Sequence, residues 1–162
     1  MIIRKAKSSD LKDITEIYND AVKNTVATFD LKPKTVDEQR IWFKEHGSKN
    51  PILVAEQNGV IVGWVSLSKY DDKLAYSDTV ELSLYVKEGF QGQGIGKKLM
   101  EKIIEEGKKA GVHVILVRIT DGNKISTHLH EKFGFKHVGV LKQVGFKFGR
   151  YLDVYIMQKI LD

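Results

Sequence analysis

The chain has 162 residues, and its 26 lysine and arginine residues against 21 aspartate and glutamate residues give a formal net charge of +5 at pH 7. This length fits one domain with a substantial core, and the fractions of 42% hydrophobic and 29% charged residues are ordinary for a globular protein. The absence of cysteine excludes disulfides, thiolate metal sites and a cysteine nucleophile. No apolar run is long enough to span a membrane and no signal-like segment follows Met1, so we expect a single cytoplasmic domain over residues 1–162.

The basic residues are scattered among acidic ones along the predicted helices and are not gathered with aromatic residues. Such a distribution is typical of a solvated surface rather than of a nucleic-acid interface. We therefore expect no nucleic acid and no membrane as partners, although the charge is compatible with a polyanionic cofactor. The histidines lack partners at ligand spacing, so we expect no metal site.

Apolar periodicity and turn signals divide the first half of the chain into five elements. Apolar residues from Leu11 to Val22 recur at helical spacing behind candidate caps at residues 8–10, and Thr35-x-x-Glu38 is a capping box. Asn58-Gly59 is a strong hairpin signal. The expected elements are a strand over 1–6, helices over 11–22 and from 36 onward, and antiparallel strands over 52–55 and 60–67.

The stretch from Thr79 to Gly96 is the most informative part of the sequence. It begins as a strand with apolar and polar residues alternating at period 2, where Val80, Leu82, Leu84 and Val86 share one face and Thr79, Glu81, Ser83 and Tyr85 share the other. A turn with Gly92, Gly94 and Gly96 then leads into a long helix that ends at Gly111. The apolar run over 112–119 predicts a buried parallel strand, which completes a right-handed β-α-β unit.

The last third of the chain is predicted to hold one short helix and two strands. Asp121 or Asn123 can cap the helix, which runs through Lys132 and ends at Gly134. The strands are expected over 135–144 and 152–160, joined through a turn over 145–149.

The glycine turn joins the end of a strand to the start of a helix, and such a junction is suited to binding an anion. Glycines let a ligand approach the backbone, and the first turn of a helix offers free N–H groups and a positive dipole end. A P-loop is excluded because Gln91 stands where its first glycine belongs and Lys98 where its hydroxyl belongs; a dinucleotide fingerprint is excluded because the glycines alternate. The remaining pattern, Gln91-x-x-Gly94-x-Gly96, resembles the acyl-CoA pyrophosphate loop of the GNAT superfamily of N-acetyltransferases.

Several separated motifs narrow this resemblance and extend it over nearly the whole chain. The sequence is similar to the phosphinothricin and methionine sulfoximine N-acetyltransferase branch at Glu81-Leu-Ser-Leu-Tyr-Val86, Gln91-Gly-Gln-Gly-Ile-Gly96, His130-Glu-Lys-Phe-Gly-Phe135 and Val144-Gly-Phe-Lys-Phe-Gly149 with Asp153 and Met157. The resemblance implies an α/β (α+β) acyl-CoA N-acyltransferase fold, with a mixed twisted sheet of about seven strands, four helices, and splayed parallel strands that hold the cofactor. It also allows a homodimer, since members of this branch often complete the pocket with the partner's last strands.

The resemblance also implies roles in catalysis. Glu81 matches the general base of the family, although a carboxylate on a strand can equally be a surface or salt-bridging residue. The N–H of Leu84 or of Tyr85 could bind the thioester oxygen where the strands diverge. His130 matches a family position to which we assign an acid or water-orienting role. Alternatively, His130 is a hydrogen-bonded structural histidine of the short helix, and we interpret His128 in this structural way.

Acetyl-CoA is the cofactor that the resemblance implies. Its expected contacts are Leu84, Tyr85, Val86, Gln91, Gly92, Gln93, Gly94, Ile95, Gly96, Lys97, Asn123 and Ser126. Asn123 and Ser126 match the polar pair that holds the pantetheine arm, and Lys97 could meet a phosphate or be an exposed helix lysine.

The acceptor is expected to be the primary amine of a small molecule, such as an amino acid or an analogue. Phe29 matches the phenylalanine that covers the acceptor in this branch, or it is a core anchor, and Tyr76 and Thr79 are candidate walls. Relatives carry paired cations in the loop before the catalytic strand, where this sequence has Asp71 and Lys73. Three alternatives stay open: an acyl-CoA-binding relative without activity, an enzyme acting on a peptide or protein amine, and a nucleotide or nucleic-acid module.

Overall fold

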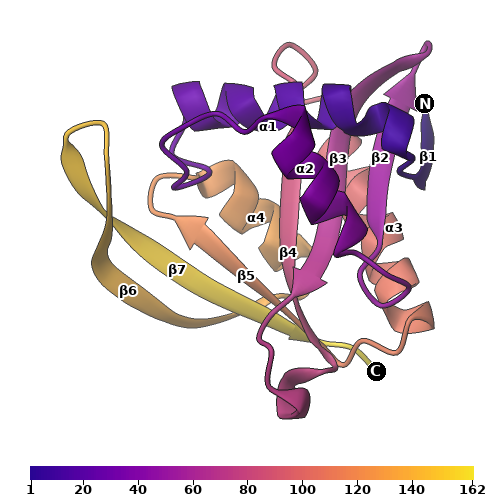
Figure 1. Ribbon diagram of the computed structural model, residues 1–162. Coiled ribbons are helices and arrows are strands. Elements are labelled where there is room, and N and C mark those ends of the chain that lie inside the picture. Colours follow the sequence, from indigo (N-terminus) through magenta and orange to yellow (C-terminus); the bar gives the residue numbers. More distant parts are fainter.

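A computed structural model describes residues 1–162. Its sheet has seven strands in the order β1-β2-β3-β4-β5-β7-β6, with α1 and α2 on one face and α3 and α4 on the other (Figure 1). The elements in chain order are β1 (Ile2–Lys5), η1 (Ser8–Asp10), α1 (Leu11–Asn24), α2 (Val36–Lys44), β2 (Ile52–Gln57), β3 (Val60–Lys69), η2 (Leu74–Tyr76), β4 (Thr79–Val86), α3 (Ile95–Lys109), β5 (Val114–Thr120), α4 (Lys124–Lys132), β6 (Lys136–Lys147) and β7 (Arg150–Ile160). The predicted mixed sheet with four helices is confirmed. None of these helices is long and apolar enough to cross a membrane.

Local signals in the sequence set most of the element boundaries. The Asn58-Gly59 turn joins β2 to β3 with φ of 51° and 78°, the left-handed values that a two-residue hairpin needs. Thr35 Oγ1 accepts a hydrogen bond from the Glu38 N–H at 3.1 Å and so caps α2. Of the two candidate caps for α4, Asn123 is the one used, because its Oδ1 accepts from the Ser126 N–H at 3.3 Å.

The prediction for the last hairpin was wrong in its boundaries. The strands continue to a two-residue turn at Phe148-Gly149, where φ is 52° and 75°, and Gly145 pairs with Leu152 inside the ladder. A bulge between Leu141 and Gly145 accompanies this longer strand. Gly145 serves a close approach instead of a turn, since a Cβ at this position would overlap the ring of Phe29.

The core has two parts, one on each face of the sheet. The larger cluster packs the sheet against α3 around Leu99, Met100 and Ile103, and the smaller one packs it against α1 and α2 around Ile14 and Trp64. The two faces of β4 divide as the alternation predicted, with Val80 and Leu82 in the larger cluster. Glu81, Ser83 and Tyr85 consequently point to the face that carries α1 and α2.

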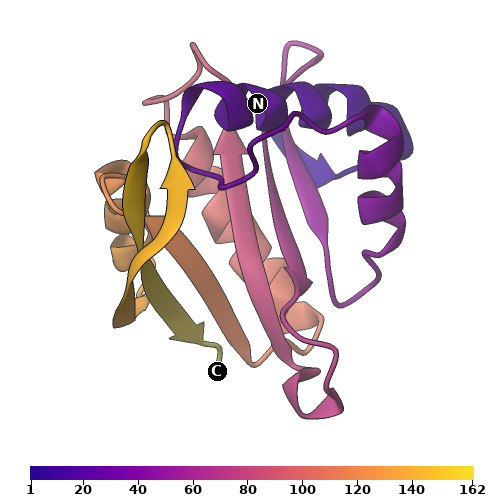
Figure 2. The ribbon, with the colours of Figure 1, turned by 60° about the vertical axis from the view of Figure 1, so that its left-hand side comes forward.

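The two parallel strands in the middle of the sheet separate after a short contact. β4 pairs with β5 only from Thr79 and Val114 to Glu81 and Leu116. Beyond this point β4 stays with β3 as far as Val86, and β5 stays with β7 as far as Thr120. Figure 2 shows β4 and β5 diverging toward the end of the molecule that carries α1. The predicted splay is therefore present, and it opens the middle of the sheet.

Candidate active site

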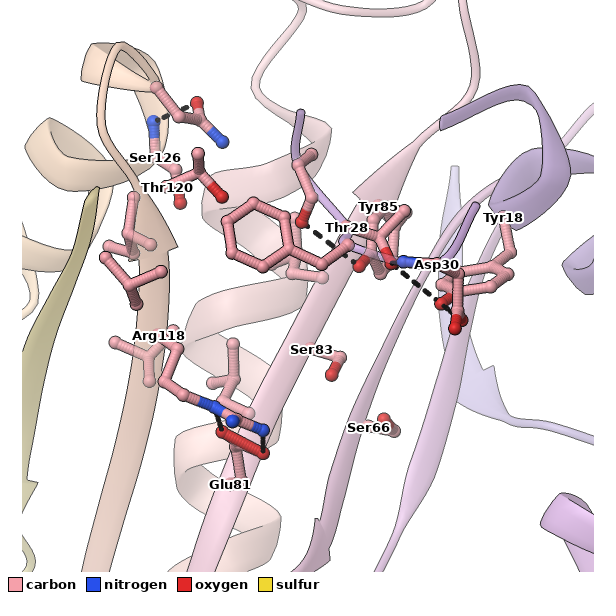
Figure 3. A pocket seen from close by; sticks show the side chains of 18 of the residues that line it. Tyr18, Thr28, Asp30, Ser66, Glu81, Ser83, Tyr85, Arg118, Thr120 and Ser126 are labelled. Carbon is pink, nitrogen blue, oxygen red and sulfur yellow. Dashed lines mark hydrogen bonds and ion pairs between the residues drawn. The ribbon is translucent and has the colours of Figure 1, made fainter. Parts of the chain in front are cut away.

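A cavity of about 690 Å³ lies where β4 and β5 diverge. On the side of α1 and α2 it is lined by Glu81, Ser83 and Tyr85 of β4 together with the loop before α2, including residues 27–30. On the opposite side it reaches Asn123, Ser126 and His130 at α4. Figure 3 shows Glu81, Ser83 and Tyr85 on β4 and, across the gap between the strands, Ser126 of α4. One continuous space therefore connects the two faces of the sheet.

Glu81 is held by an arginine that the sequence analysis did not single out. Arg118 of β5 donates from Nε to Glu81 Oε2 at 2.5 Å and from Nη2 to Glu81 Oε1 at 2.8 Å (Figure 3). These hydrogen bonds raise the pKa of Arg118, which stays charged. The signal that could have revealed it is a single charge inside the otherwise apolar run from Val114 to Ile119, on the same strand face as Thr120.

Two tyrosines form the wall of the cavity beside α1. The Tyr18 hydroxyl donates to Asp30 Oδ2 and lies 2.9 Å from Thr28 Oγ1, and the ring of Tyr85 packs edge-on against that of Tyr18. Burial raises the pKa of Tyr85 to about 12 and raises that of Tyr18 as well. Both tyrosines therefore stay neutral, so their hydroxyl groups can form hydrogen bonds at the cavity wall but do not act as bases. Tyr85 was predicted only through its backbone, and Tyr18 was not predicted at all.

The loop that carries Phe29 is fixed from behind by the last hairpin. Phe29 lines the cavity, and its ring lies directly over Gly145 of β6. Lys147, two residues further along β6, is only 3% exposed and donates from Nζ to the Thr28 carbonyl at 2.8 Å. Burial lowers the pKa of Lys147. The β6–β7 hairpin thus determines the position of the Phe29 ring.

Two buried polar side-chain atoms of β3 in the cavity wall have no partner. Trp64 Nε1 and Ser66 Oγ belong to neighbouring positions on one face of β3, and their residues are 2% and 1% exposed. Buried donors without partners are rare in folded proteins, because each costs the free energy of a lost hydrogen bond. Both residues line the cavity, so a ligand there can satisfy them.

The strand alternation selects one of the two backbone donors left open by the sequence. The Val114 N–H donates to the carbonyl of Asp78, whereas the Lys87 N–H donates to Val62 of β3. Even-numbered residues of β4 therefore direct their backbone groups toward β5, and odd-numbered ones toward β3. Pairing with β5 ends at Glu81, so the N–H of Leu84 faces the open gap and that of Tyr85 does not.

His130 is buried at the α4 side of the cavity, with 2% of its surface exposed. Its Nδ1 lies 2.7 Å from the Ser126 carbonyl, which can only accept, so Nδ1 carries the hydrogen. Burial lowers the pKa of His130, and the neutral ring then has its lone pair on Nε2, an atom with no partner. In this state His130 accepts a hydrogen bond or orients water, and it cannot act as the acid. Ser126 Oγ lies 3.4 Å from the same Nδ1.

The glycine turn has the geometry that a pyrophosphate requires. Gly92 and Gly94 have φ of 76° and 80°, and a Cβ at either would meet no atom within 4 Å, so the backbone is open to a ligand. α3 begins at Ile95 with no acidic residue in its first turn, and Lys97 is exposed there. Free N–H groups, a positive dipole end and a lysine together fit an anionic ligand. The Gln91 side chain donates weakly to the Val86 carbonyl at 3.4 Å.

Four predicted acceptor residues do not line this cavity. Asp71, Lys73, Tyr76 and Thr79 lie at or before the start of β4, in or next to the loop that carries η2. The Asp71 carboxylate accepts from the Lys73 N–H at 2.8 Å, so it is occupied by its own loop. Their roles stay predictions. No group of three or more His, Asp or Glu side chains is arranged to hold a metal ion.

Comparison with known proteins identifies the family. The model of the Acetyltransferase (GNAT) family matches residues 11–135. The chain belongs to this family. The L-methionine sulfoximine/L-methionine sulfone acetyltransferase of Salmonella typhimurium is 39% identical over 163 residues, covering 100% of this chain and 95% of that protein. The phosphinothricin N-acetyltransferase of Streptomyces coelicolor is 36% identical, covering 94% of this chain and 91% of that protein.

A solved structure agrees with the sequence relatives. The Salmonella typhimurium protein yncA, solved with its cofactor acetyl-CoA, has a TM-score of 0.96 and 38% identity and covers 99% of this chain and 94% of that one. This GNAT chain is therefore an acetyl-CoA-dependent N-acetyltransferase with the acyl-CoA N-acyltransferase fold, as the sequence predicted. The open glycine turn, the splayed strands and the unpartnered Nε2 of His130 fit this cofactor.

Proposed function

We propose that this GNAT enzyme transfers the acetyl group of acetyl-CoA directly to the primary amine of a small amino-acid-like molecule, with Glu81 as the general base. The observation that carries the proposal is the single cavity that connects α4 to Glu81 across the gap in the sheet. A thioester entering beside α4 and an amine entering beside Glu81 would meet in it. Its volume of about 690 Å³ is within the range of small-molecule sites.

Three groups of this chain have distinct tasks in the proposed reaction. Glu81 takes the proton of the acceptor ammonium, which frees the nitrogen lone pair for attack on the acetyl carbonyl carbon. The N–H of Leu84 hydrogen-bonds the carbonyl oxygen while negative charge develops on it. As the carbon–sulfur bond breaks, the second proton of the attacking nitrogen passes to the sulfur, directly or through an ordered water. Nε2 of His130 accepts a hydrogen bond from the resulting thiol or from that water.

Direct attack is favoured because the cavity offers no activated nucleophile. The chain has no cysteine. Ser126 is the cavity serine that lies near a histidine nitrogen, but this Nδ1 already donates its hydrogen to the Ser126 carbonyl and cannot act as a base toward the hydroxyl. An acetylated enzyme is therefore not required.

The acceptor class rests on the relatives and on the polar wall of the cavity. Curated relatives are named for methionine sulfoximine, methionine sulfone and phosphinothricin, which are amino acids with a second polar group. The unpartnered groups of Trp64 and Ser66 can hydrogen-bond oxygen atoms of such a group. A peptide or protein amine is the alternative.

We also propose that the chain forms a homodimer through the β6–β7 hairpin. β6 is an edge strand, and the hairpin exposes a row of large apolar side chains, Val138, Val140, Val144, Phe146, Phe148 and Tyr151. In Figure 1 the hairpin extends beyond the rest of the sheet. A second copy of this chain would cover both the apolar surface and the free edge. Light scattering that gives the mass of one chain at micromolar concentration would reject this arrangement.

The test of the base uses Glu81→Gln, with Glu101→Gln on the exposed side of α3 as the matched control. Release of free thiol from acetyl-CoA is followed with a panel of amino acids, methionine sulfone, phosphinothricin, polyamines and short peptides. We expect the parent to prefer small amino acids, Glu101→Gln to match it, and Glu81→Gln to lose on the order of 10²-fold in kcat with acetyl-CoA binding unchanged. Full activity of Glu81→Gln across the pH range would mean that the base is another group or water, and a preference for peptides would reject the acceptor class.

A further inference from the structure

The ion pair between Glu81 and Arg118 leaves hydrogen-bonding capacity on both partners. The guanidinium has five N–H donors on three nitrogens, and only Nε and Nη2 are used, both on Glu81. The carboxylate has room for about four hydrogen bonds and receives two. The Arg118 side chain is 65% exposed and lines the cavity, while that of Glu81 is 24% exposed. A ligand in the cavity can therefore reach the free nitrogen of Arg118 while Glu81 remains in place.

This pair offers opposite charges side by side, and an α-amino acid carries the complementary arrangement. Its ammonium and its carboxylate are attached to the same carbon, so a site that reads both needs an anion and a cation next to each other. Glu81 and Arg118 meet this condition because they lie on the adjacent strands β4 and β5, near the position where the pairing of these strands ends. A planar guanidinium is also the side chain best matched to a carboxylate.

The lysines near the proposed acceptor site either interact with other groups of the protein or lie outside the cavity. Lys34 lies between two carboxylates, 3.9 Å from Asp30 and 4.0 Å from Glu38. Lys147 is buried behind residues 27–30 with its ammonium on the Thr28 carbonyl. Lys73, on the loop before β4, does not line the cavity. Among these groups Arg118 is the cation that faces Glu81.

We propose that Arg118 binds the α-carboxylate of the acceptor and makes this enzyme selective for α-amino acids over amines without a carboxylate. The inference rests on the proposed function, in which Glu81 receives the α-ammonium. Arg118 is then a binding residue that sets specificity.

The test compares two acceptors that differ only in the carboxylate. L-methionine sulfone and 3-(methylsulfonyl)propan-1-amine are assayed with the parent, Arg118→Gln, Arg118→Lys and the control Arg40→Gln, whose arginine lies on α2 and does not line the cavity. We expect Arg118→Gln to lose roughly 10- to 100-fold in kcat/KM for the sulfone, mainly through KM, because a charged hydrogen bond to the carboxylate is removed. The amine should change less than about threefold, and Arg118→Lys should restore part of the loss.

The outcomes separate the possible reasons for failure. Equal losses of kcat for both acceptors in Arg118→Gln would mean that Arg118 only orients Glu81, which overturns the carboxylate assignment. An unchanged ratio between the two acceptors would overturn it as well. If the parent turns over neither acceptor while calorimetry shows acetyl-CoA binding, the acceptor class of the proposed function is wrong. Thermal melting of each variant ensures that the comparison is made between folded proteins.

Discussion

Replacing Gly145 by alanine tests whether the last hairpin positions the loop over the acceptor. A Cβ at Gly145 would overlap the Phe29 ring, with two further ring atoms at 2.5 Å and 2.7 Å, so the ring must move. The loop cannot simply withdraw, because Lys147 holds the Thr28 carbonyl and Tyr18 holds Asp30. An added group in a packed site costs about 2 kcal/mol, which for a chain of this size lowers Tm by roughly 4–8 °C.

The assay for Gly145→Ala combines thermal melting with kinetics for both substrates. We expect KM for the acceptor to rise about tenfold, since the displaced ring narrows the cavity, and KM for acetyl-CoA to stay within a factor of about two. Gly139→Ala is the matched control, because a Cβ at that β6 position would meet no atom within 4 Å. Combining Gly145→Ala with Phe29→Ala removes the overlap, so the two changes together should cost less than the sum of their separate effects. The reasoning fails if Gly145→Ala behaves like Gly139→Ala, or if the two changes are additive.

Two further predictions concern the cofactor and the pH dependence of stability. Gly96→Val should weaken acetyl-CoA binding by at least about tenfold, because the added side chain would lie beside the backbone N–H groups of the turn; unchanged affinity by calorimetry would remove this turn from the site. Little loss of Tm is expected, since the added Cβ would lie 3.5 Å from Leu129, which is an ordinary contact distance. Burial lowers the pKa of both His46 and His130 in the folded chain, so below about pH 6.5 the unfolded chain binds more protons and the folded state loses stability as the pH falls. Tm should therefore fall between pH 7.5 and 5.5, and less steeply in His130→Gln; an equal slope in that variant would show that His130 does not contribute.

Much of the fold follows from short stretches of sequence. The period-2 alternation from Thr79 to Val86, the Asn58-Gly59 turn and the caps at Thr35 and Asn123 each act over a few residues, so each could be read locally and each is present in the structure. The Gln91-x-x-Gly94-x-Gly96 turn is local in the same sense, because the backbone dihedrals and helix-end N–H groups that suit it to an anion belong to neighbouring residues. The family was predicted from the resemblance of this turn and of the other separated motifs to a known family, and the resemblance in turn implied the cofactor and the splayed strands.

The contacts between distant side chains were decided only by the tertiary structure. Arg118 meets Glu81 across 37 residues because the β4–β5 pairing ends at Glu81 and Leu116, and Lys147 meets Thr28 across 119 residues because the last hairpin packs behind the loop before α2. The tautomer of His130 likewise depends on the carbonyl that happens to face Nδ1. Sequence periodicity shows which face of a strand a residue occupies, but it does not show which residue of another strand lies opposite. For this reason the chemistry of the acetyl donor could be predicted from the sequence, while the groups that surround the acceptor required the fold.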